Sequence, residues 1–266
     1  MSEIKAKTII TKSKLPKVEY CFNPYIGCTV GCVYCYARFM GRFSGHSNEK
    51  WGTYFDWKIN APDLLEKELP DIKKKGGVVL LGSVTDCYQP AERRLEITRK
   101  SLEVFLKYQI PISILTKNVL AERDFDLLSQ FDYCEFGMSI GVLNQVIAKV
   151  LEPYASMPED RVALLEKAHN AGLKTYVFIG PLHPGVSDLS TILKRVAPYV
   201  YFAMGEIPNL RCGNWPDLMV VLNRLHIEPE VYKKIAESQS FYDETKNLLI
   251  RLCQDAGIEY KGVFKH

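Results

Sequence analysis

The sequence predicts an α/β fold: a partial (β/α)6 TIM-like barrel with a C-terminal helical cap. Short apolar runs, typical of buried parallel strands, alternate with stretches of helical periodicity along most of the 266 residues. About six strand–helix units can be counted, fewer than in a full barrel of this type. Beyond Glu206 the alternation gives way to a polar loop and a long helical stretch. We therefore expect parallel strands joined by right-handed crossovers, followed by a cap.

The elements are expected in the following order. The first strand precedes Cys28, and the aromatic, β-branched run 51–59 is extended. Asn60 and Pro62 begin the first helix, because asparagine caps helices and proline suits a first turn. Further strands are expected at 78–82, 111–116, 133–140, 174–180 and 199–204. Helices are expected at 92–108, 121–131, 143–151, 158–171, 189–196 and 230–256, the last followed by a short segment at 258–260.

These boundaries divide the chain into three parts. Residues 1–17 form a basic N-terminal arm, 18–205 the barrel, and 206–266 a cap packed on the barrel. The arm contains several lysines against only Glu3 and Glu19, namely Lys5, Lys7, Lys12, Lys14 and Lys17. Two interpretations of it stay open: an arm that follows a phosphate backbone, or a solvated, mobile tail.

Composition narrows the class of protein. The chain is 47% hydrophobic, enough for a sizeable core, and its net charge of +3 decides little. No apolar run approaches the roughly 20 residues that span a membrane, so no membrane association is expected. The first residues lack the apolar stretch of a secretory signal. Eight cysteines in such a chain indicate a reducing, cytoplasmic location and a metal role for some of them rather than a disulfide framework.

Cys28, Cys32 and Cys35 form a C-x3-C-x2-C run. A [4Fe–4S] cluster usually takes four cysteines, so three leave one iron open to a small molecule. An open coordination position is typical of catalytic rather than structural metal sites. The alternative is a zinc knuckle completed by Cys21 or His46, although such knuckles more often contain paired C-x2-C units.

This motif, with the aromatic Tyr34 before its last cysteine, resembles the signature of radical S-adenosylmethionine (SAM) enzymes. The resemblance implies a [4Fe–4S] cluster on the three cysteines and SAM on the open iron. One electron then cleaves SAM to methionine and a 5′-deoxyadenosyl radical, which abstracts hydrogen from the substrate. The six-unit barrel fits the partial barrel typical of these enzymes.

A second informative segment, residues 82–92, follows a predicted strand and precedes a helix. Thr85 can accept a hydrogen bond and Asp86 can neutralise a positive charge, which suits an ammonium ligand. The alternative is a helix-capping turn with solvated polar groups. Since active sites of such barrels lie at the carboxyl ends of the strands, this segment and the cysteine motif are expected at the same mouth.

Residues 82–92 resemble the spore photoproduct lyase-like branch of the superfamily, also called DNA repair photolyase-like. That branch commonly has Thr-Asp-Pro-Tyr-Gln-Pro here, and Cys87 replaces the first proline. Further matches are Asn23-Pro24-Tyr25-x-Gly27-Cys28, Ile97-Thr98-Arg99, Ile114-Leu115-Thr116-Lys117, and Leu151-Glu152-Pro153 with Pro158 and Arg161. The matches extend from about Asn23 to Asp188, which is most of the predicted barrel.

The branch resemblance implies cofactor contacts residue by residue. Tyr34 approaches the adenine, Thr85 the methionine end of SAM, and Asp86 lies near them. Lys117 pairs with the SAM carboxylate, and Ser139 reaches the same region. Lys117 is also predicted from charge, because a lysine that closes an apolar strand at the barrel mouth needs an anion. The alternative is a surface lysine whose stem covers apolar residues.

Two residues are candidates for catalysis. Spore photoproduct lyases carry a hydrogen-donating cysteine where this chain has Ser83, and Cys87 in the same loop is the proposed substitute; the alternative is a small buried residue. His183 follows the fifth strand and is a candidate for proton transfer or for a hydrogen bond to an anionic substrate. Weaker candidates by position are Cys212, as a second metal ligand or hydrogen donor, and Glu206 and Arg211, as substrate ligands.

The sequence thus predicts a radical SAM enzyme that draws electrons from a partner such as flavodoxin or ferredoxin. The branch resemblance implies a nucleic-acid lesion or a modified nucleotide as substrate. The first alternative is a radical SAM enzyme that acts on a peptide or a small molecule. The alternative from another class is a zinc-bearing nucleic-acid-binding module without catalysis.

Overall fold

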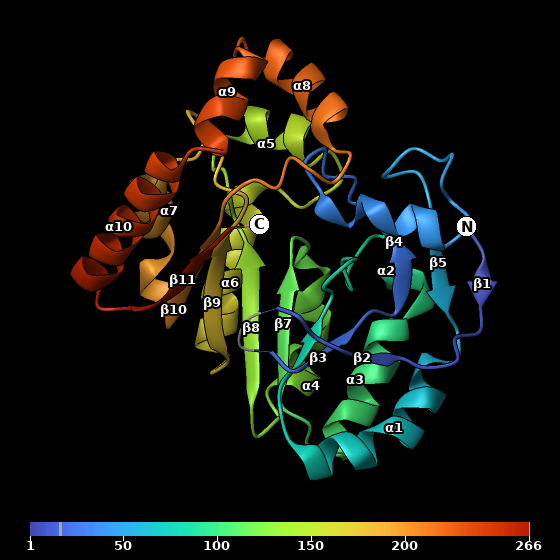
Figure 1. The fold of residues 1–266 in the computed structure, drawn as a ribbon. Helices are drawn as coiled ribbons and strands as arrows, with labels where there is room; N and C mark the ends of the chain where they lie inside the picture. The colour runs from blue at the N-terminus through green and yellow to red at the C-terminus, as the bar shows by residue number, and fades with distance from the viewer. Residues whose placement is uncertain (16–17, 266) are drawn as a thin grey trace.

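A single curved sheet of eight strands forms the centre of the computed structural model, which describes residues 1–15 and 18–265 (Figure 1). Its strands are β2 (Ile10–Lys12), β3 (Tyr20–Phe22), β6 (Val79–Leu81), β7 (Ile112–Thr116), β8 (Cys134–Ser139), β9 (Lys174–Ile179), β10 (Phe202–Glu206) and β11 (Glu259–Phe264). Their spatial order is β11-β10-β9-β8-β7-β6-β3-β2. Neighbours are parallel except β2 and β3, which are antiparallel.

The six strands from β3 to β10 are the predicted parallel strands in the predicted order, so the expected α/β partial barrel is confirmed. The helices are α1 (Ala61–Lys75), α2 (Glu92–Leu95), α3 (Ile97–Lys107), α4 (Phe125–Leu128), α5 (Gln145–Leu151), α6 (Pro158–Asn170), α7 (Leu189–Val196), α8 (Trp215–Arg224), α9 (Pro229–Ala236) and α10 (Gln239–Ala256). Three 3-10 helices complete them, η1 (Tyr36–Phe43), η2 (Val119–Asp124) and η3 (Ala197–Tyr199).

Two predicted helices are interrupted. The stretch 92–108 breaks at Glu96, whose φ of 55° places it in the left-handed region and separates α2 from α3. The stretch 230–256 breaks before Gln239, where the Ser238 side chain caps α10 by accepting from the Phe241 amide. In both cases a local backbone conformation overrides a continuous helical pattern.

Side chains along each strand point alternately to the two faces of the sheet, one toward the core beneath the helices and one toward the cavity inside the barrel. In β8, Phe136 and Met138 point out and are fully buried beneath the covering helices. Gly137, between them, faces inward, where the ring of Tyr176 fills the space a Cβ would take. The Tyr176 hydroxyl reaches across to donate to the Ile114 carbonyl at 3.0 Å. This crossing ring ties β9 to β7 inside the barrel.

The C-terminal region is more than a helical cap, and the prediction is incomplete there. β11 pairs in parallel with β10 and extends the sheet, while α10 packs on α7 and β11. Only α8 and α9 lie over the barrel mouth beside α5 (Figure 1). The strand was missed because Glu259, Lys261 and Gly262 belong to residue types that are depleted in strands.

The N-terminal arm is ordered against the barrel, which contradicts the solvated, mobile tail for residues 1–15. β1 (Glu3–Ile4) joins β5 (Phe55–Lys58) and β4 (Tyr25–Gly27) in a three-stranded sheet, and β2 pairs with β3. Ile9 is buried in the main core, which holds the segment between β1 and β2. Lys17 lies outside the described residues. Within the described part of the chain, no helix has the length and apolar character needed to cross a membrane.

Candidate functional site

The three cysteines of the motif lie on one loop that leaves β4 at the barrel mouth. Gly27 begins the turn with a φ of 76°, and a Cβ there would lie 2.6 Å from the Tyr54 carbonyl oxygen, so glycine is required. Cys28 and Cys32 are each only 7% exposed, and Cys35 is half-buried. None of the three is in a disulfide. The loop therefore presents three free thiols from one short stretch of backbone.

Burial controls the protonation of these thiols. It raises the pKa of Cys28 to about 12, helped by the negative charge of Asp86, and raises the pKa of Cys35 to about 11. Thiolates ligate metals, and a bound metal cation inverts this effect by stabilising the deprotonated form. The chemistry of this donor set therefore fits an iron–sulfur cluster, with one thiolate for each of three irons and none for the fourth.

A cavity of about 760 Å³ runs from the cysteine loop into the barrel. Its lining includes all of the cluster ligands and cofactor contacts that the sequence predicts, namely Cys28, Cys32, Cys35, Tyr34, Thr85, Asp86, Lys117 and Ser139. These eight residues come from four separate segments of sequence, and the fold brings them to one cavity. The two residues predicted to be catalytic, Cys87 and His183, are not part of the lining.

Lys117, directly after β7, brings a positive charge into the lining of the cavity beside the cysteine loop. Burial lowers the pKa of its ammonium, but Cys32 and Glu152 outweigh burial and raise the pKa above its ordinary value. Its Nζ lies 5.8 Å from the centre of the Tyr34 ring, within range of a cation–π contact. A charged ammonium beside three thiols inside a cavity is suited to binding a carboxylate.

Asp86 holds this lysine in place through the backbone. Its carboxylate accepts four hydrogen bonds of 2.7–3.0 Å, from the Tyr88 amide, the Thr116 hydroxyl, the Lys117 amide and the Asn118 side chain. Since protein donors occupy its oxygens, Asp86 contributes negative charge to the cavity wall and fixes the backbone position of Lys117. The sequence prediction of a direct ammonium contact did not include this role.

Thr85 and Gln89 fix the cysteine loop from the loop after β6. The Thr85 hydroxyl donates to the Gly27 carbonyl at 2.6 Å and accepts from Gln89 at 3.3 Å. The Gln89 side-chain oxygen accepts from both the amide and the hydroxyl of Thr29, directly after Cys28. The buried Gln89 is thus a functional residue that sequence reasoning quoted only as part of a motif.

Tyr34 is oriented by a buried ion pair. Its hydroxyl donates to Glu152, which also accepts from the guanidinium of Arg161. Arg161, only 1% exposed, donates further to the Ser139 carbonyl at 2.9 Å. Burial opposes the charge of Glu152, but Arg161 and Lys117 lower the pKa of its carboxyl below the usual range. Glu152 and Arg161 are two of the residues that match the branch, and in this structure they hold the Tyr34 ring in position.

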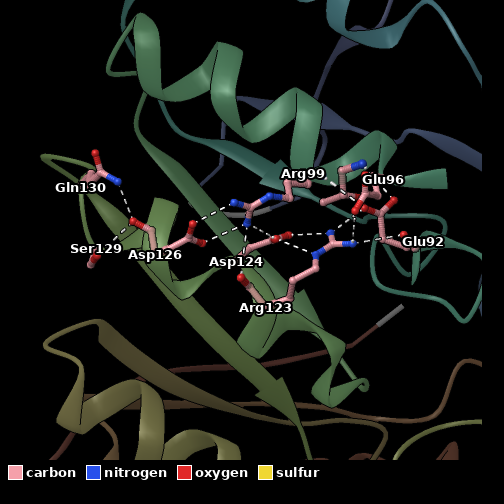
Figure 2. A network of polar contacts seen from close by, with 9 residues as sticks. Glu92, Glu96, Arg99, Arg123, Asp124, Asp126, Ser129 and Gln130 are labelled. Atoms are coloured by element: carbon pink, nitrogen blue, oxygen red, sulfur yellow. Dashed lines mark hydrogen bonds and ion pairs between the residues drawn. The ribbon is translucent and has the colours of Figure 1, made fainter. Parts of the chain in front are cut away.

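A second polar network anchors the same loops from outside the barrel (Figure 2). Buried Glu92 accepts from the Tyr25 hydroxyl, three residues before Cys28, and from Arg123. Arg123 and Arg99 both pair with Asp124, which is fully buried. Figure 2 shows Glu92, Arg123, Asp124 and Arg99 side by side in this network. The Arg99 of the matched Ile97-Thr98-Arg99 segment therefore has a structural role.

His183 lies beside the cavity rather than in its lining. Its Nδ1 is 2.6 Å from the Tyr232 hydroxyl, and its ring packs edge-on against Tyr34 with 5.1 Å between centres. Its Nε2 is buried without a hydrogen-bond partner among the described residues. Burial lowers the pKa of His183 to about 4, which leaves the imidazole neutral near pH 7. The geometry suits a neutral hydrogen-bonding group next to Tyr34, and the predicted contact with an anionic substrate stays untested.

Cys87 is the prediction that the structure contradicts. Its side chain is 1% exposed and belongs to the main hydrophobic core, away from the cavity lining. Its carbonyl accepts from the Thr98 hydroxyl at 2.7 Å, and its sulfur packs near Gly82. The loop after β6 turns so that Thr85 and Asp86 line the cavity and Cys87 points behind them. Cys87 is a packing residue in the proline position of the branch.

Replacing Cys87 by alanine is therefore expected to leave product formation unchanged. Loss of one buried sulfur atom removes packing contacts and destabilises the fold by about 1 kcal/mol. Denaturant unfolding and product analysis measure the two effects separately. A stable variant that releases aberrant products would instead restore Cys87 as a hydrogen donor.

Of the two residues proposed to complete a zinc knuckle, His46 has other partners and Cys21 is buried in a strand. His46 is held between Glu49 and Asp56, at 2.5 Å and 2.6 Å from its two ring nitrogens, and it stacks on Tyr54. Cys21 is buried within β3. In residues 1–15 and 18–265, no three His, Cys, Asp or Glu side chains are grouped as for a single metal ion. Because carboxylates engage both of its ring nitrogens, His46 is not placed as the fourth ligand of a zinc knuckle.

The segment after β10 covers the cysteine loop from the far side. Asn214, fully buried, donates to the Tyr34 carbonyl at 2.6 Å. Arg38, just after the motif, pairs with Asp217 at 2.9 Å and donates to the Val33 carbonyl. Glu206 lines the cavity, whereas Cys212 and Arg211 do not. Neither Asn214 nor Arg38 stands out in the sequence, because their partners lie about 180 residues away.

Comparison with known proteins places the fold and the motif in one family. Residues 22–194 match the Radical SAM superfamily. An uncharacterised protein of Methanocaldococcus jannaschii is 33% identical over 267 residues, which cover 99% of this chain and 97% of the relative.

Solved structures agree. A spore photoproduct lyase mutant has a TM-score of 0.74 at 14% identity, covering 98% of this chain and 80% of that one. A mutant of the same enzyme with bound S-adenosylmethionine and dinucleoside spore photoproduct has a TM-score of 0.70 at 15% identity, with the same coverage. The chain therefore belongs to the radical S-adenosylmethionine superfamily and has the fold of its spore photoproduct lyase-like branch.

Proposed function

We propose that the protein is a radical SAM enzyme that holds a [4Fe–4S] cluster on Cys28, Cys32 and Cys35. The observation that supports this most is the shared cavity of three free thiols and the Lys117 ammonium. When bound, the cluster and SAM supply the 5′-deoxyadenosyl radical that abstracts hydrogen from the substrate. The protein supplies binding, orientation and a closed environment.

Each side chain has a defined task in this proposal. Lys117 binds the SAM carboxylate, with Asp86 fixing its backbone. Thr85 lies at the methionine end, and Ser139 faces the same region from β8. Tyr34, oriented by Glu152, packs against the adenine. A partner such as flavodoxin or ferredoxin delivers the electron.

For the substrate, we propose a nucleic-acid lesion or a modified nucleotide. Support comes from the fold shared with spore photoproduct lyase, which was solved with a dinucleoside spore photoproduct bound. The cavity wall also offers aromatic rings for a base to stack on, including Tyr176, Phe178 and Phe202. Incubation of the reduced protein with SAM and damaged oligonucleotides tests this proposal. Conversion of a peptide or a small molecule instead would show that the proposed substrate class is wrong, although the proposed radical SAM chemistry would stand.

Anaerobic purification tests the cluster itself. A brown protein with about four irons per chain is expected, from the cluster type in the proposal. A colourless protein with one zinc per chain would favour the nucleic-acid-binding module without catalysis.

Replacing Lys117 by alanine is expected to weaken SAM binding about tenfold or more, from the 1.5–3 kcal/mol of a charge-assisted hydrogen bond. The backbone bond from residue 117 to Asp86 is kept, so the iron content stays the same. Isothermal titration calorimetry measures the affinity, with Lys100→Ala on the exposed face of α3 as the control. Equal affinity in the Lys117 variant would remove this residue from the cofactor site.

A further inference from the structure

On its outer side, the cysteine loop packs backbone to backbone against a second segment of the chain. Gly31, between Cys28 and Cys32, contacts Gly52 backbone to backbone: a Cβ on Gly52 would lie 2.9 Å from the Gly31 Cα. Their φ angles of 68° and 95° favour glycine at both positions. Both residues are partly exposed. At this point the backbones of Gly31 and Gly52, with no side chain of their own, lie between the proposed metal centre and the surface.

An exposed aromatic ring and two lysines lie around the Gly31–Gly52 contact. Tyr154, 63% exposed, lies beside Gly31, and its amide donates to the Val30 carbonyl at 3.3 Å. Lys149 is exposed and donates to the Pro153 carbonyl at 2.9 Å, which fixes it next to Tyr154. Lys50 is exposed two residues before Gly52. We call Lys50, Gly52, Lys149 and Tyr154 the cluster-loop face.

This face is separate from the proposed substrate cavity. Gly31, Gly52 and Tyr154 do not line the cavity, whereas Val30 and Cys32 on the same loop do. The loop thus has one side toward the cavity and one toward the cluster-loop face. Glu49, the acidic neighbour of Lys50, is paired with His46, so the two charged residues of the cluster-loop face, Lys50 and Lys149, are both positive.

We infer that the cluster-loop face is the docking surface for an electron-transfer protein with acidic side chains around its redox group. The inference rests on the proposed function, because it requires a metal centre on the three cysteines. One electron leaves the donor's reduced flavin and enters that centre across the Gly31–Gly52 contact, and no atom is transferred. Lysines at the edge steer an acidic partner, and Tyr154 supplies the apolar contact. Small, weak interfaces of this kind are typical of electron-transfer pairs.

The experiment compares an acidic flavodoxin with dithionite, a small reductant that needs no docking surface. The variants are Lys50→Glu combined with Lys149→Gln, and separately Tyr154→Ala. The control, Lys100→Glu combined with Lys194→Gln, makes the same charge change on exposed faces of α3 and α7. Calorimetric titration of oxidised flavodoxin into the cluster-loaded protein measures binding, and stopped-flow bleaching measures reduction.

Both face variants are expected to bind flavodoxin about tenfold more weakly at low ionic strength. The lysine variant is also expected to lose most of the salt dependence of binding, whereas Tyr154→Ala keeps it because it changes no charge. Their reduction by flavodoxin slows accordingly, while dithionite reduces them like the wild type. If the variants bind and accept electrons from flavodoxin like the control, or if flavodoxin does not bind the wild type, the inference is wrong although the cluster stands. If the wild-type protein binds no iron, the proposed function is wrong, and the inference that rests on it is wrong as well.

Discussion

Replacing Cys32 by alanine is expected to abolish cluster retention. With two thiolates left in the loop, neither the number of ligands nor their spacing suffices for the cluster. The same loss is expected for alanine at Cys28 or Cys35, because each thiol occupies a separate position on the loop. Iron and sulfide analysis after anaerobic reconstitution measures the effect directly.

Two other cysteines provide the matched control. Cys134 and Cys253 are buried in the main core, outside the cavity, so alanine there leaves the iron content unchanged. Circular dichroism confirms that each variant is folded. Full iron in the Cys32 variant would show that the cluster is held elsewhere.

Replacing Arg161 by methionine is expected to destabilise the fold by about 3–5 kcal/mol, because it leaves the Glu152 carboxylate buried and uncompensated. Tyr34 is affected as well, since its hydroxyl shares the same carboxylate. Denaturant unfolding of the cluster-free protein gives the free energy without any contribution from bound cofactor. The exposed pair of Arg195 and Glu159 is the control, where Arg195→Met costs roughly 0–1 kcal/mol.

A double variant separates charge from packing. Glu152→Gln together with Arg161→Met removes both charges, so it is expected to cost less than Arg161→Met alone. The Tyr34 hydroxyl keeps an amide oxygen as acceptor in that variant. The single variants Glu152→Gln and Arg161→Met complete the comparison. If the loss of unfolding free energy in the double variant equals the sum of the losses in the two single variants, the two side chains are not energetically coupled and the explanation is wrong.

The sequence was sufficient to predict the order of six parallel strands and to name eight residues that lie together in the lining of the cavity. Strand runs such as Val79–Leu81 are short, apolar and bounded by glycine, so their type and place follow from local pattern. The cysteine spacing is local too, and it includes Tyr34. The other predicted cofactor contacts lie at or shortly after strand ends, where the topology of a parallel barrel gathers side chains.

The rest depended on information that the local pattern does not contain. The direction of Cys87 is set by the turn that places Thr85 and Asp86 toward the cavity, and the local sequence does not report the path of that turn. Asn214 reaches Tyr34 across 180 residues, and no periodicity reports such a contact. β11 was missed because pairing with β10, rather than strand propensity, stabilises it.

The open edge of the sheet has a mechanical consequence. β2 and β11 are the two outer strands and do not pair with one another, yet Lys14, after β2, and Lys265, after β11, line the same cavity. Separating any neighbouring pair of strands in this sheet breaks a hydrogen-bonded ladder, whereas no such ladder joins β2 to β11 in the strand order. We therefore expect the barrel wall to be most compliant along this seam.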